Sequence, residues 1–333
     1  MMDLNDRSIL ITGGTGSFGR RFVSYVLENF KPKRLVVFSR DEQKQFEMEQ
    51  DLPVSQHPQL RYFIGDVRDA ERLEAAMRDI EFVVHAAAMK QVTTAEYNPF
   101  ECVRTNIHGA ENIVNAAIRS GVSRVVALST DKAANPVNLY GATKLASDKI
   151  FIAANNMSGE GGARFSVVRY GNVLGSRGSV VPLYQRLIAD GAASLPVTDE
   201  RMTRFWITID QGVSFVLDNL ERMSGGEIFV PKLPSMKIVD LARALAPDCD
   251  IKIIGIRAGE KLHEVMVPQD DSRTTLDLGE YFVIEPAFHQ WSRENYLEIH
   301  GGQPVVEDFE YSSATNDKWL TPDSLREMLN TNE

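Results

Sequence analysis

Short apolar runs recur through the first half of the chain, and a longer stretch with helical spacing follows most of them. Such runs have the length of buried strands, and apolar residues three and four positions apart between them predict helices. Strands that alternate with helices in this way form a parallel sheet with helices on both faces. We therefore expect an α/β fold with a doubly wound parallel sheet of the Rossmann type. The expected strands are residues 8–12, 34–38, 60–64, 82–85, 125–128 and 165–170.

The pattern changes after residue 171, where the apolar positions become less regular. We expect two interleaved domains, residues 1–171 and residues 172–333, the second forming a smaller C-terminal lobe. Ligands of open parallel sheets bind beyond the carboxyl ends of the strands, so we expect this lobe to bind the substrate at that edge. The expected helices are residues 17–28, 42–50, 99–120 and 140–156 in the first domain and 209–223 in the second.

A glycine-rich loop joins the first expected strand to the first helix. Glycines at this point allow a tight turn and a close approach of the backbone to a ligand. The N-terminus of the helix that follows favours a pyrophosphate. Strand, loop and helix together predict the phosphate-binding turn of a dinucleotide site. Its expected contacts are Gly13, Thr15, Gly16, Ser17, Phe18 and Gly19.

The second strand ends in residues that select between the two nicotinamide dinucleotides. A carboxylate at this tip suits the ribose 2′-hydroxyl of NAD, whereas an arginine suits the 2′-phosphate of NADP. Ser39 and Arg40 stand at the tip, and Lys44 follows one helical turn later. We interpret Asp41 as the N-cap of the next helix, because Asp is a favoured N-cap residue. We therefore expect NADP, held in part by Ser39, Arg40 and Lys44.

The third and fourth strands supply further candidate contacts to the cofactor. After the third strand, Asp66 could accept from the adenine amino group, with Val67 as an apolar wall. After the fourth strand, the small residues Ala86 and Ala87 allow the backbone to approach the cofactor closely. His85 precedes them, and at the end of an apolar strand we interpret it as a satisfied interior imidazole rather than a catalyst.

The stretch from residue 128 to residue 144 carries the candidate catalytic groups. Thr130, Asp131 and Lys132 come at the carboxyl end of the fifth strand, where ligands of such sheets bind. Tyr140 and Lys144 are four residues apart, so on a helix they share one face. We expect the Lys144 ammonium to favour the Tyr140 phenolate, which is otherwise scarce because a free tyrosine titrates near ~10. The cluster is typical of a site that moves protons, and a capped helix with a solvated charge pair is the alternative.

Four arginines stand out in the second half of this acidic chain. Clustered arginines favour phosphate recognition, because a guanidinium binds phosphate through paired hydrogen bonds. Each arginine taken singly is more readily explained as part of a surface ion pair. The four are Arg177, Arg201, Arg204 and Arg257.

Composition limits the function classes. The chain has 333 residues, a formal net charge of −10 and no long basic block, which argues against nucleic-acid binding. Its two cysteines cannot form a disulfide framework, and the sequence contains no metal-ligand spacing. It also contains no signal region and no apolar run long enough to span a bilayer. We expect a cytoplasmic protein that binds neither nucleic acid nor membrane and uses no metal.

Motifs spread over residues 7–280 resemble those of a known family. In order they are TGGTGSFG, SRDEQKQ, GDVRD, HAAAMK, STDKAANPVNLYGATK, RYGNVLGSRGSVVP, ERMTRFWI and IRAGEKLHE. They are similar to motifs of extended short-chain dehydrogenase/reductases that act on nucleotide sugars, and most closely to the inverting UDP-N-acetylglucosamine 4,6-dehydratases, which open the pathway to pseudaminic acid. The resemblance implies an NADP-dependent hydro-lyase that acts on UDP-N-acetylglucosamine and forms a homo-oligomer, either a dimer or a hexamer.

The resemblance also implies a role for each candidate residue. Thr130, Asp131 and Lys132 match the family's Thr-Asp-Lys, and Tyr140 and Lys144 match its Tyr-Lys pair. Tyr140 would take the proton of the C4 hydroxyl. Asp131 would protonate the departing C6 hydroxyl, and Lys132 would remove the C5 proton. The implied substrate contacts are Lys90, Asn172, Val180, Thr198, Met202, Arg204, Arg257 and Glu260, and Lys90 would also contact the cofactor.

Three other functions stay open. A nucleotide-sugar 4-epimerase needs Tyr140 and Lys144 but no acid and base after the strand, so Asp131 and Lys132 argue against it. A retaining UDP-N-acetylglucosamine 4,6-dehydratase shares the Thr-Asp-Lys but carries Met in place of Tyr140. A catalytically silent dinucleotide-sensing protein typically lacks the Tyr or the Lys. One departure from the inverting group is Gln91, where a His is expected, and it leaves the choice of hexose open.

Overall fold

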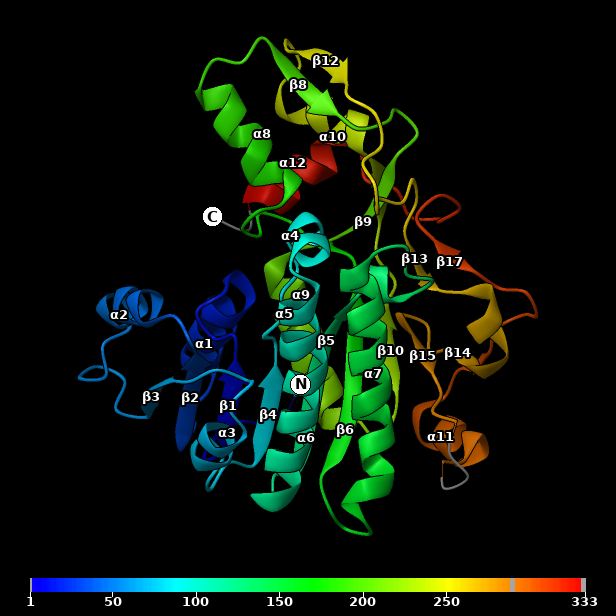
Figure 1. Ribbon diagram of the computed structural model, residues 1–333. Helices are drawn as coiled ribbons and strands as arrows, with labels where there is room; N and C mark the ends of the chain where they lie inside the picture. Colours follow the sequence, from blue (N-terminus) through cyan, green and yellow to red (C-terminus); the bar gives the residue numbers. More distant parts are fainter. Residues whose placement is uncertain (1, 288–290, 331–333) are drawn as a thin grey trace.

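Ten strands form a single sheet through the larger lobe of the computed structural model, which describes residues 2–287 and 291–330 (Figure 1). Their order across the sheet is β16-β14-β15-β10-β6-β5-β4-β1-β2-β3. The strands from β10 to β3 in this order are parallel, and Leu10 of β1 lies between Val36 of β2 and Val83 of β4. The parallel strands are β1 (Ser8–Thr12), β2 (Arg34–Ser39), β3 (Leu60–Ile64), β4 (Phe82–His85), β5 (Arg124–Thr130), β6 (Arg164–Tyr170) and β10 (Ile228–Pro231).

The predicted doubly wound parallel sheet is confirmed, and the observed sheet is wider than the prediction. All six expected strands are present as β1 to β6, while β10 and three antiparallel strands come from the second half of the chain. These additional strands are only two to four residues long, so they gave no periodic signal in the sequence. The antiparallel strands are β15 (Tyr281–Ile284), β14 (Thr275–Asp277) and β16 (Gln303–Pro304).

Helices cover both faces of the sheet. On one face α3 (Ala70–Ala76), α6 (Gly109–Arg119) and α7 (Leu139–Ser158) pack side by side, and on the other α1 (Ser17–Asn29) packs against α9 (Ile209–Arg222) (Figure 1). Every residue of β1 and of β4 is buried, as expected for parallel strands between two helical layers. Three short helices complete this lobe: α2 (Glu42–Asp51), α4 (Val92–Tyr97) and α11 (Arg293–His300).

The helix expected over residues 99–120 is interrupted in the structure. It consists of α5 (Pro99–Val103), a π-helical turn (Arg104–His108) and α6. The side chain of Asn106 in this turn donates to the Met89 carbonyl at 3.0 Å and accepts from the Met89 amide at 2.8 Å. It also donates to the Thr143 hydroxyl at 3.0 Å. The turn therefore fixes the loop after β4 against α7, which carries the candidate catalytic pair.

The smaller lobe lies beyond the carboxyl ends of the parallel strands (Figure 1). Its core contains Trp206, Tyr184 and Met202, all buried. Because α9, β10 and the antiparallel strands return to the large sheet, residues 172–333 contribute to both lobes, and the boundary at residue 171 stays a prediction. The elements of this lobe are α8 (Val180–Ala189), β8 (Ser194–Val197), α10 (Ile238–Leu245), β12 (Asp250–Ile253), α12 (Pro322–Asn330) and the small sheet of β11 (Ser235–Lys237), β9 (Thr203–Ile207) and β7 (Asn172–Val173).

A short strand pair and a 3₁₀ turn pack against each other next to the site. The strand β13 (Val265–Val267) pairs with β17 (Tyr311–Ser312), and a 3₁₀ turn (Asp131–Ala133) follows β5 directly. The turn contacts both α7 and β13. Within residues 2–287 and 291–330, none of the helices has both the length and the apolar character that a bilayer crossing requires.

Candidate active site

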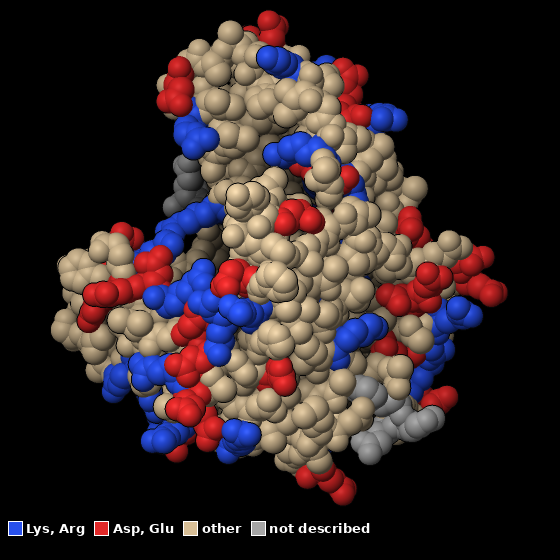
Figure 2. Space-filling view, in the orientation of Figure 1, with Lys and Arg blue, Asp and Glu red and all other residues tan. Residues whose placement is uncertain are grey.

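A cavity of about 550 Å³ opens at the carboxyl edge of the parallel sheet, below the smaller lobe. The surface is visibly hollowed between the two lobes on the left of the space-filling view (Figure 2). The cavity is lined by the glycine loop, the tips of β2 to β6 and the segment 171–179. Every residue predicted to contact the cofactor lines it: Gly13, Thr15, Gly16, Ser17, Phe18, Gly19, Ser39, Arg40, Lys44, Asp66, Val67, Ala86, Ala87, Lys90, Tyr140 and Lys144.

The glycine loop needs its glycines for close packing. Gly13 has a φ of +64°, and a Cβ there would lie 2.9 Å from the Ala87 amide nitrogen. A Cβ on Gly19 would lie 2.5 Å from the Cα of Gly14. Gly16 is the N-cap residue of α1 and brings no side chain to cap it. The first amide groups of α1 are therefore left for an anionic ligand, which fits the pyrophosphate of a dinucleotide.

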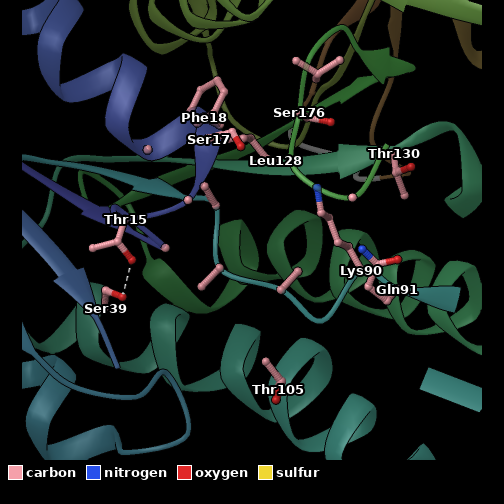
Figure 3. Close-up of a pocket in the computed structure, with 18 of the residues that line it drawn as sticks. Thr15, Ser17, Phe18, Ser39, Lys90, Gln91, Thr105, Leu128, Thr130 and Ser176 are labelled. Carbon is pink, nitrogen blue, oxygen red and sulfur yellow. Dashed lines mark hydrogen bonds between the residues drawn. The ribbon is translucent and has the colours of Figure 1, made fainter. Parts of the chain in front are cut away.

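At the tip of β2, Asp41 caps the next helix, and Ser39 and Arg40 line the cavity. Asp41 caps α2 by accepting from the Lys44 amide at 3.0 Å, which confirms the N-cap interpretation. Its carboxylate also pairs with the Lys44 ammonium at 2.6 Å. Ser39 and Thr15 share a hydrogen bond of 2.8 Å at the cavity wall (Figure 3). The guanidinium of Arg40 is 59% exposed and 3.7 Å from Asp66, so it remains accessible to a ligand.

Asp66 is less available to adenine than the sequence suggested. The side chain of Arg68 donates to it twice, at 3.0 and 2.7 Å. Burial alone would raise the pKa of Asp66, but the hydrogen bonds and charge of Arg68 outweigh it, so the pKa lies below its usual value. The interpretation of His85 is supported by its contacts. It is 1% exposed, shares a 2.8 Å hydrogen bond with Thr12, and burial lowers its pKa to about 3.

Thr130, Asp131 and Lys132 form a hydrogen-bonded cluster at the end of β5. The Thr130 hydroxyl donates to Asp131 Oδ1 at 2.9 Å, and Lys132 Nζ donates to the same oxygen at 3.0 Å. Asp131 is 1% exposed and lies behind the residues that line the cavity. Burial alone would lower the pKa of Lys132, but the charges of Asp131 and Glu264 outweigh it and raise the pKa. Lys132 is therefore an ammonium in this arrangement and has to release a proton before it can act as a base.

Tyr140 and Lys144 are buried neighbours on the first two turns of α7. The helix begins at the N-cap Asn138, whose side chain accepts from the Gly141 amide at 2.7 Å. Burial raises the pKa of Tyr140 to about 12, while the charge of Lys132 and a hydrogen bond with Thr130 act in the opposite direction. The net pKa of Tyr140 therefore lies above its usual value, and the expectation that Lys144 favours the phenolate stays a prediction. Burial also lowers the pKa of Lys144 itself, since an ammonium is costly in a dry site.

Of the residues expected to contact the substrate, Lys90 and Asn172 line this cavity. Lys90 points into it from the loop after β4, next to Gln91 (Figure 3). The other six lie outside the lining residues, so their roles as substrate contacts stay predictions. These are Val180 at the start of α8, Thr198 after β8, Met202 in the core of the smaller lobe, Arg204 in β9, and the paired Arg257 and Glu260.

The four arginines of the expected cluster differ in their surroundings, and their role in phosphate recognition stays a prediction. Arg201 pairs with Asp199 at 2.8 Å on the surface, as the ion-pair alternative predicts. Arg257 is 63% exposed and pairs with Glu260. Arg204 is buried and donates to the carbonyls of Lys261 and Leu262. Three of the four are thus committed to protein partners.

Sequence reasoning missed two buried carboxylates beside the cluster. Glu264, 1% exposed, lies 3.1 Å from Lys132 Nζ. Asp148, also 1% exposed, accepts from Ser129 at 2.7 Å and lies 3.4 Å from Arg169. The motif IRAGEKLHE contains Glu264, yet only the fold brings its last residue to the end of β5. No group of three or more His, Cys, Asp or Glu within the described ranges is placed to hold a metal ion.

Comparison with known proteins gives the family. The model described as "Polysaccharide biosynthesis protein" matches residues 9–286. The chain belongs to this family. The resemblance drawn from the motifs is confirmed, because the chain is 58% identical to the "UDP-N-acetylglucosamine 4,6-dehydratase (inverting)" of Campylobacter jejuni subsp. jejuni over 333 residues, with 99% of each chain covered.

Two further proteins are similar to this chain over almost its whole length. It is 39% identical to a "UDP-glucose 4-epimerase" of Rickettsia canadensis, over 98% of this chain and 96% of that protein. The X-ray structure of Pen from Bacillus thuringiensis superimposes with a TM-score of 0.89 at 35% identity, covering 99% of both chains. Fold and sequence therefore agree along almost the whole chain.

Proposed function

We propose that this protein is a UDP-N-acetylglucosamine 4,6-dehydratase that inverts C5, with UDP-2-acetamido-2,6-dideoxy-β-L-arabino-hex-4-ulose as its product. The observation that carries the proposal is the hydrogen-bonded pair of Asp131 and Lys132, of which Lys132 lines the cavity together with Tyr140. A relative 58% identical over the full length is named for this reaction. The reaction removes water across C5 and C6 of the sugar without net oxidation.

The cofactor that fits the larger part of the cavity is a nicotinamide dinucleotide. The glycine loop and the free start of α1 would hold its pyrophosphate, and Lys144 would hold the ribose next to the nicotinamide. When bound, this group takes hydride from sugar C4 and later returns it to C6. We propose NADP rather than NAD, because Arg40 is exposed at the tip of β2 while Asp41 is occupied in capping α2.

Tyr140 is the proposed base for the C4 hydroxyl. Its phenol lies beside Thr130, which lowers its pKa through a hydrogen bond, and it faces the positive charge of Lys132. Both effects stabilise a phenolate as it forms. The 4-ketone produced in this step acidifies the proton on C5, and that makes the elimination possible.

Asp131 and Lys132 hold one proton between them, and its position decides what they can do. Movement of that proton across the 3.0 Å contact, from Lys132 Nζ to Asp131 Oδ1, gives an amine and a carboxylic acid with no change in total charge. In that form Asp131 can protonate the departing C6 hydroxyl and Lys132 can accept the C5 proton. A bound sugar displaces water from the pair, and a drier site favours the neutral form over the ion pair.

Inversion requires that C5 regains a proton on the face opposite the one from which it lost it. Lys132 is the proposed base on the first face. Tyr140, protonated during oxidation of C4, is the proposed donor on the other face. If Lys132 served both steps, the configuration at C5 would be retained.

The experiment that tests this function is an incubation of the pure protein with UDP-N-acetylglucosamine, followed by mass spectrometry. A dehydratase gives a product lighter by one water without any added oxidant. A 4-epimerase, the name of a 39% identical relative, gives a product of unchanged mass. A dinucleotide-sensing protein leaves the sugar unaltered. The expected cytoplasmic location and the homo-oligomer, a dimer or a hexamer, stay predictions.

The choice of NADP predicts a selective effect of Arg40→Ala. Removal of the guanidinium should weaken binding of NADP(H) about 10- to 100-fold, the usual worth of a charge-assisted contact to phosphate. The affinity for NAD(H), which lacks the 2′-phosphate, should change little. Calorimetric titration of both cofactors measures the two effects, with the exposed Arg78→Ala as control. Denaturation of the purified protein should release NADP(H), and recovery of NAD(H) alone would contradict the assignment.

A further inference from the structure

The segment 257–264, called the strap below, crosses the 3₁₀ turn that carries Asp131 and Lys132. Asn138 at the start of α7 donates to the Gly259 carbonyl of the strap at 2.8 Å. Lys261 of the strap donates to the carbonyl of Ala134 at the end of the turn. The strap is therefore tied to the segment that joins the catalytic turn to α7, and its last residue is Glu264.

The carboxylate of Glu264 is a second ion-pair partner of Lys132, beside Asp131. Its Oε1 lies 3.1 Å from Lys132 Nζ and 3.7 Å from Arg204 Nε. The backbone of Glu264 is fixed as well, since its amide donates to the Ser313 hydroxyl at 2.9 Å and its carbonyl accepts from the Ser313 amide at 2.8 Å. Lys132 thus sits between two buried carboxylates, both 1% exposed.

Each carboxylate also has one oxygen without a hydrogen bond from the described residues, although Glu264 Oε2 lies 3.9 Å from Lys261 Nζ. Asp131 Oδ2 and Glu264 Oε2 are buried and accept no hydrogen bond from the residues that the structure describes. A buried carboxylate oxygen that accepts no hydrogen bond is costly, and stable packing alone gives no reason to keep two of them in one cluster. Both oxygens remain able to accept a proton from the cluster.

We propose that Glu264 is a positioning residue for the elimination, one that fixes the Lys132 amine next to Asp131 and keeps the shared proton inside the cluster. This role rests on the proposed dehydratase function. Its physical basis is the charge balance of the site. Lys132, Arg204 and Lys261 bring three cations to two carboxylates, so loss of the Glu264 charge leaves three cations facing Asp131 alone. The proton of Lys132 would then dissociate more readily.

The charged and titratable groups around Lys132 come from every element that packs on the cluster. The 3₁₀ turn contributes Asp131 and Lys132, and α7 contributes Tyr140. Strand β9 contributes Arg204, and the strap contributes Lys261, His263 and Glu264. Among these groups His263 shares a hydrogen bond of 2.8 Å with Thr203 and faces Arg204 rather than Lys132.

The test is the pH profile of the full-length Glu264→Gln enzyme, which keeps the shape of the side chain and removes its charge. Loss of an opposite charge at this distance should move the alkaline limb of the kcat profile to lower pH by about one to three units. At pH 8, kcat for dehydration should fall at least about tenfold, while KM for UDP-N-acetylglucosamine stays within about threefold. The exposed Glu307→Gln serves as control and should match the wild type.

A purely structural Glu264 would give other results. An unchanged alkaline limb in a folded Glu264→Gln protein, or a raised KM with unchanged kcat, overturns the proposal. If Glu264→Gln does not fold, Glu264→Asp is the second variant, because it retains the charge but has a shorter side chain. In this variant kcat should fall, while the alkaline limb of the kcat profile should stay at the same pH as in the wild type. Wild-type kcat in that variant also overturns the proposal. Absence of dehydration by the wild type overturns the proposed function itself, which separates the two failures.

Discussion

Replacement of Asp131 by Asn or of Lys132 by Ala is expected to reduce dehydration by roughly 10²- to 10⁴-fold, the usual effect of removing a positioned acid or base. Oxidation at C4 depends on Tyr140 and should persist in both variants. The reaction should therefore stop at the 4-keto sugar, before water is lost. A single-turnover experiment that follows the nicotinamide absorbance and the sugar mass together separates the two steps.

The variants differ in their effect on stability, and this difference provides an internal check. Lys132→Ala leaves Asp131 and Glu264 buried without their shared ammonium, so its melting temperature should fall more than that of Asp131→Asn. The exposed Lys252→Ala is the matched control for loss of a lysine. Full dehydration by either folded variant would remove that residue from the proposed mechanism.

Tyr140→Phe is expected to abolish the first step, with a loss of C4 oxidation of roughly 10²- to 10⁴-fold. The phenol carries a pKa raised to about 12 by burial, so only its small ionised fraction can act as a base at neutral pH. That fraction grows as pH rises, and the wild-type rate of C4 oxidation should therefore increase with pH on the alkaline side. The Phe variant should show no such increase.

The control for Tyr140 is a tyrosine equally buried but away from the cavity. Tyr184 packs in the smaller lobe, donates to the Pro196 carbonyl at 2.7 Å and is not among the lining residues. Tyr184→Phe should retain C4 oxidation and its dependence on pH. Equal rates in Tyr140→Phe and the wild type would rule out the phenol as the base.

The parts of the fold with a strong local pattern could be predicted from the sequence. The strands β1, β2, β4, β5 and β6 are apolar runs, and their burial between helices requires that pattern. The edge strand β3 has the same kind of run, although only Leu60 of it is buried. The spacing of the glycines predicted the loop, and the close contacts at these positions explain why glycine is needed there. Every expected cofactor contact lines one cavity because the carboxyl ends of parallel strands meet at one edge.

The rest depends on contacts between distant segments, which leave no local pattern. Glu264 meets Lys132 only because the strap crosses the turn after β5. Arg204 looked like a phosphate ligand, yet its guanidinium is bound by carbonyls of the strap. The pKa of Tyr140 was expected to fall through Lys144, but burial, which spacing along a helix does not report, has the larger effect.

Inversion at C5 is tested most directly by the configuration of the first product. The protein is incubated with UDP-N-acetylglucosamine in deuterated water, and proton NMR spectra are taken within minutes, before the ketone enolises in buffer. The two C5 epimers are diastereomers, so the shifts and couplings of H1, H2 and H3 and the shift of the C6 methyl group distinguish them. We expect the β-L-arabino 4-keto-6-deoxy sugar, because C5 receives its proton on the face opposite Lys132. C5 should carry deuterium, because the proton of the donor exchanges with the solvent. A product with only the D-xylo configuration at the first time point would contradict it.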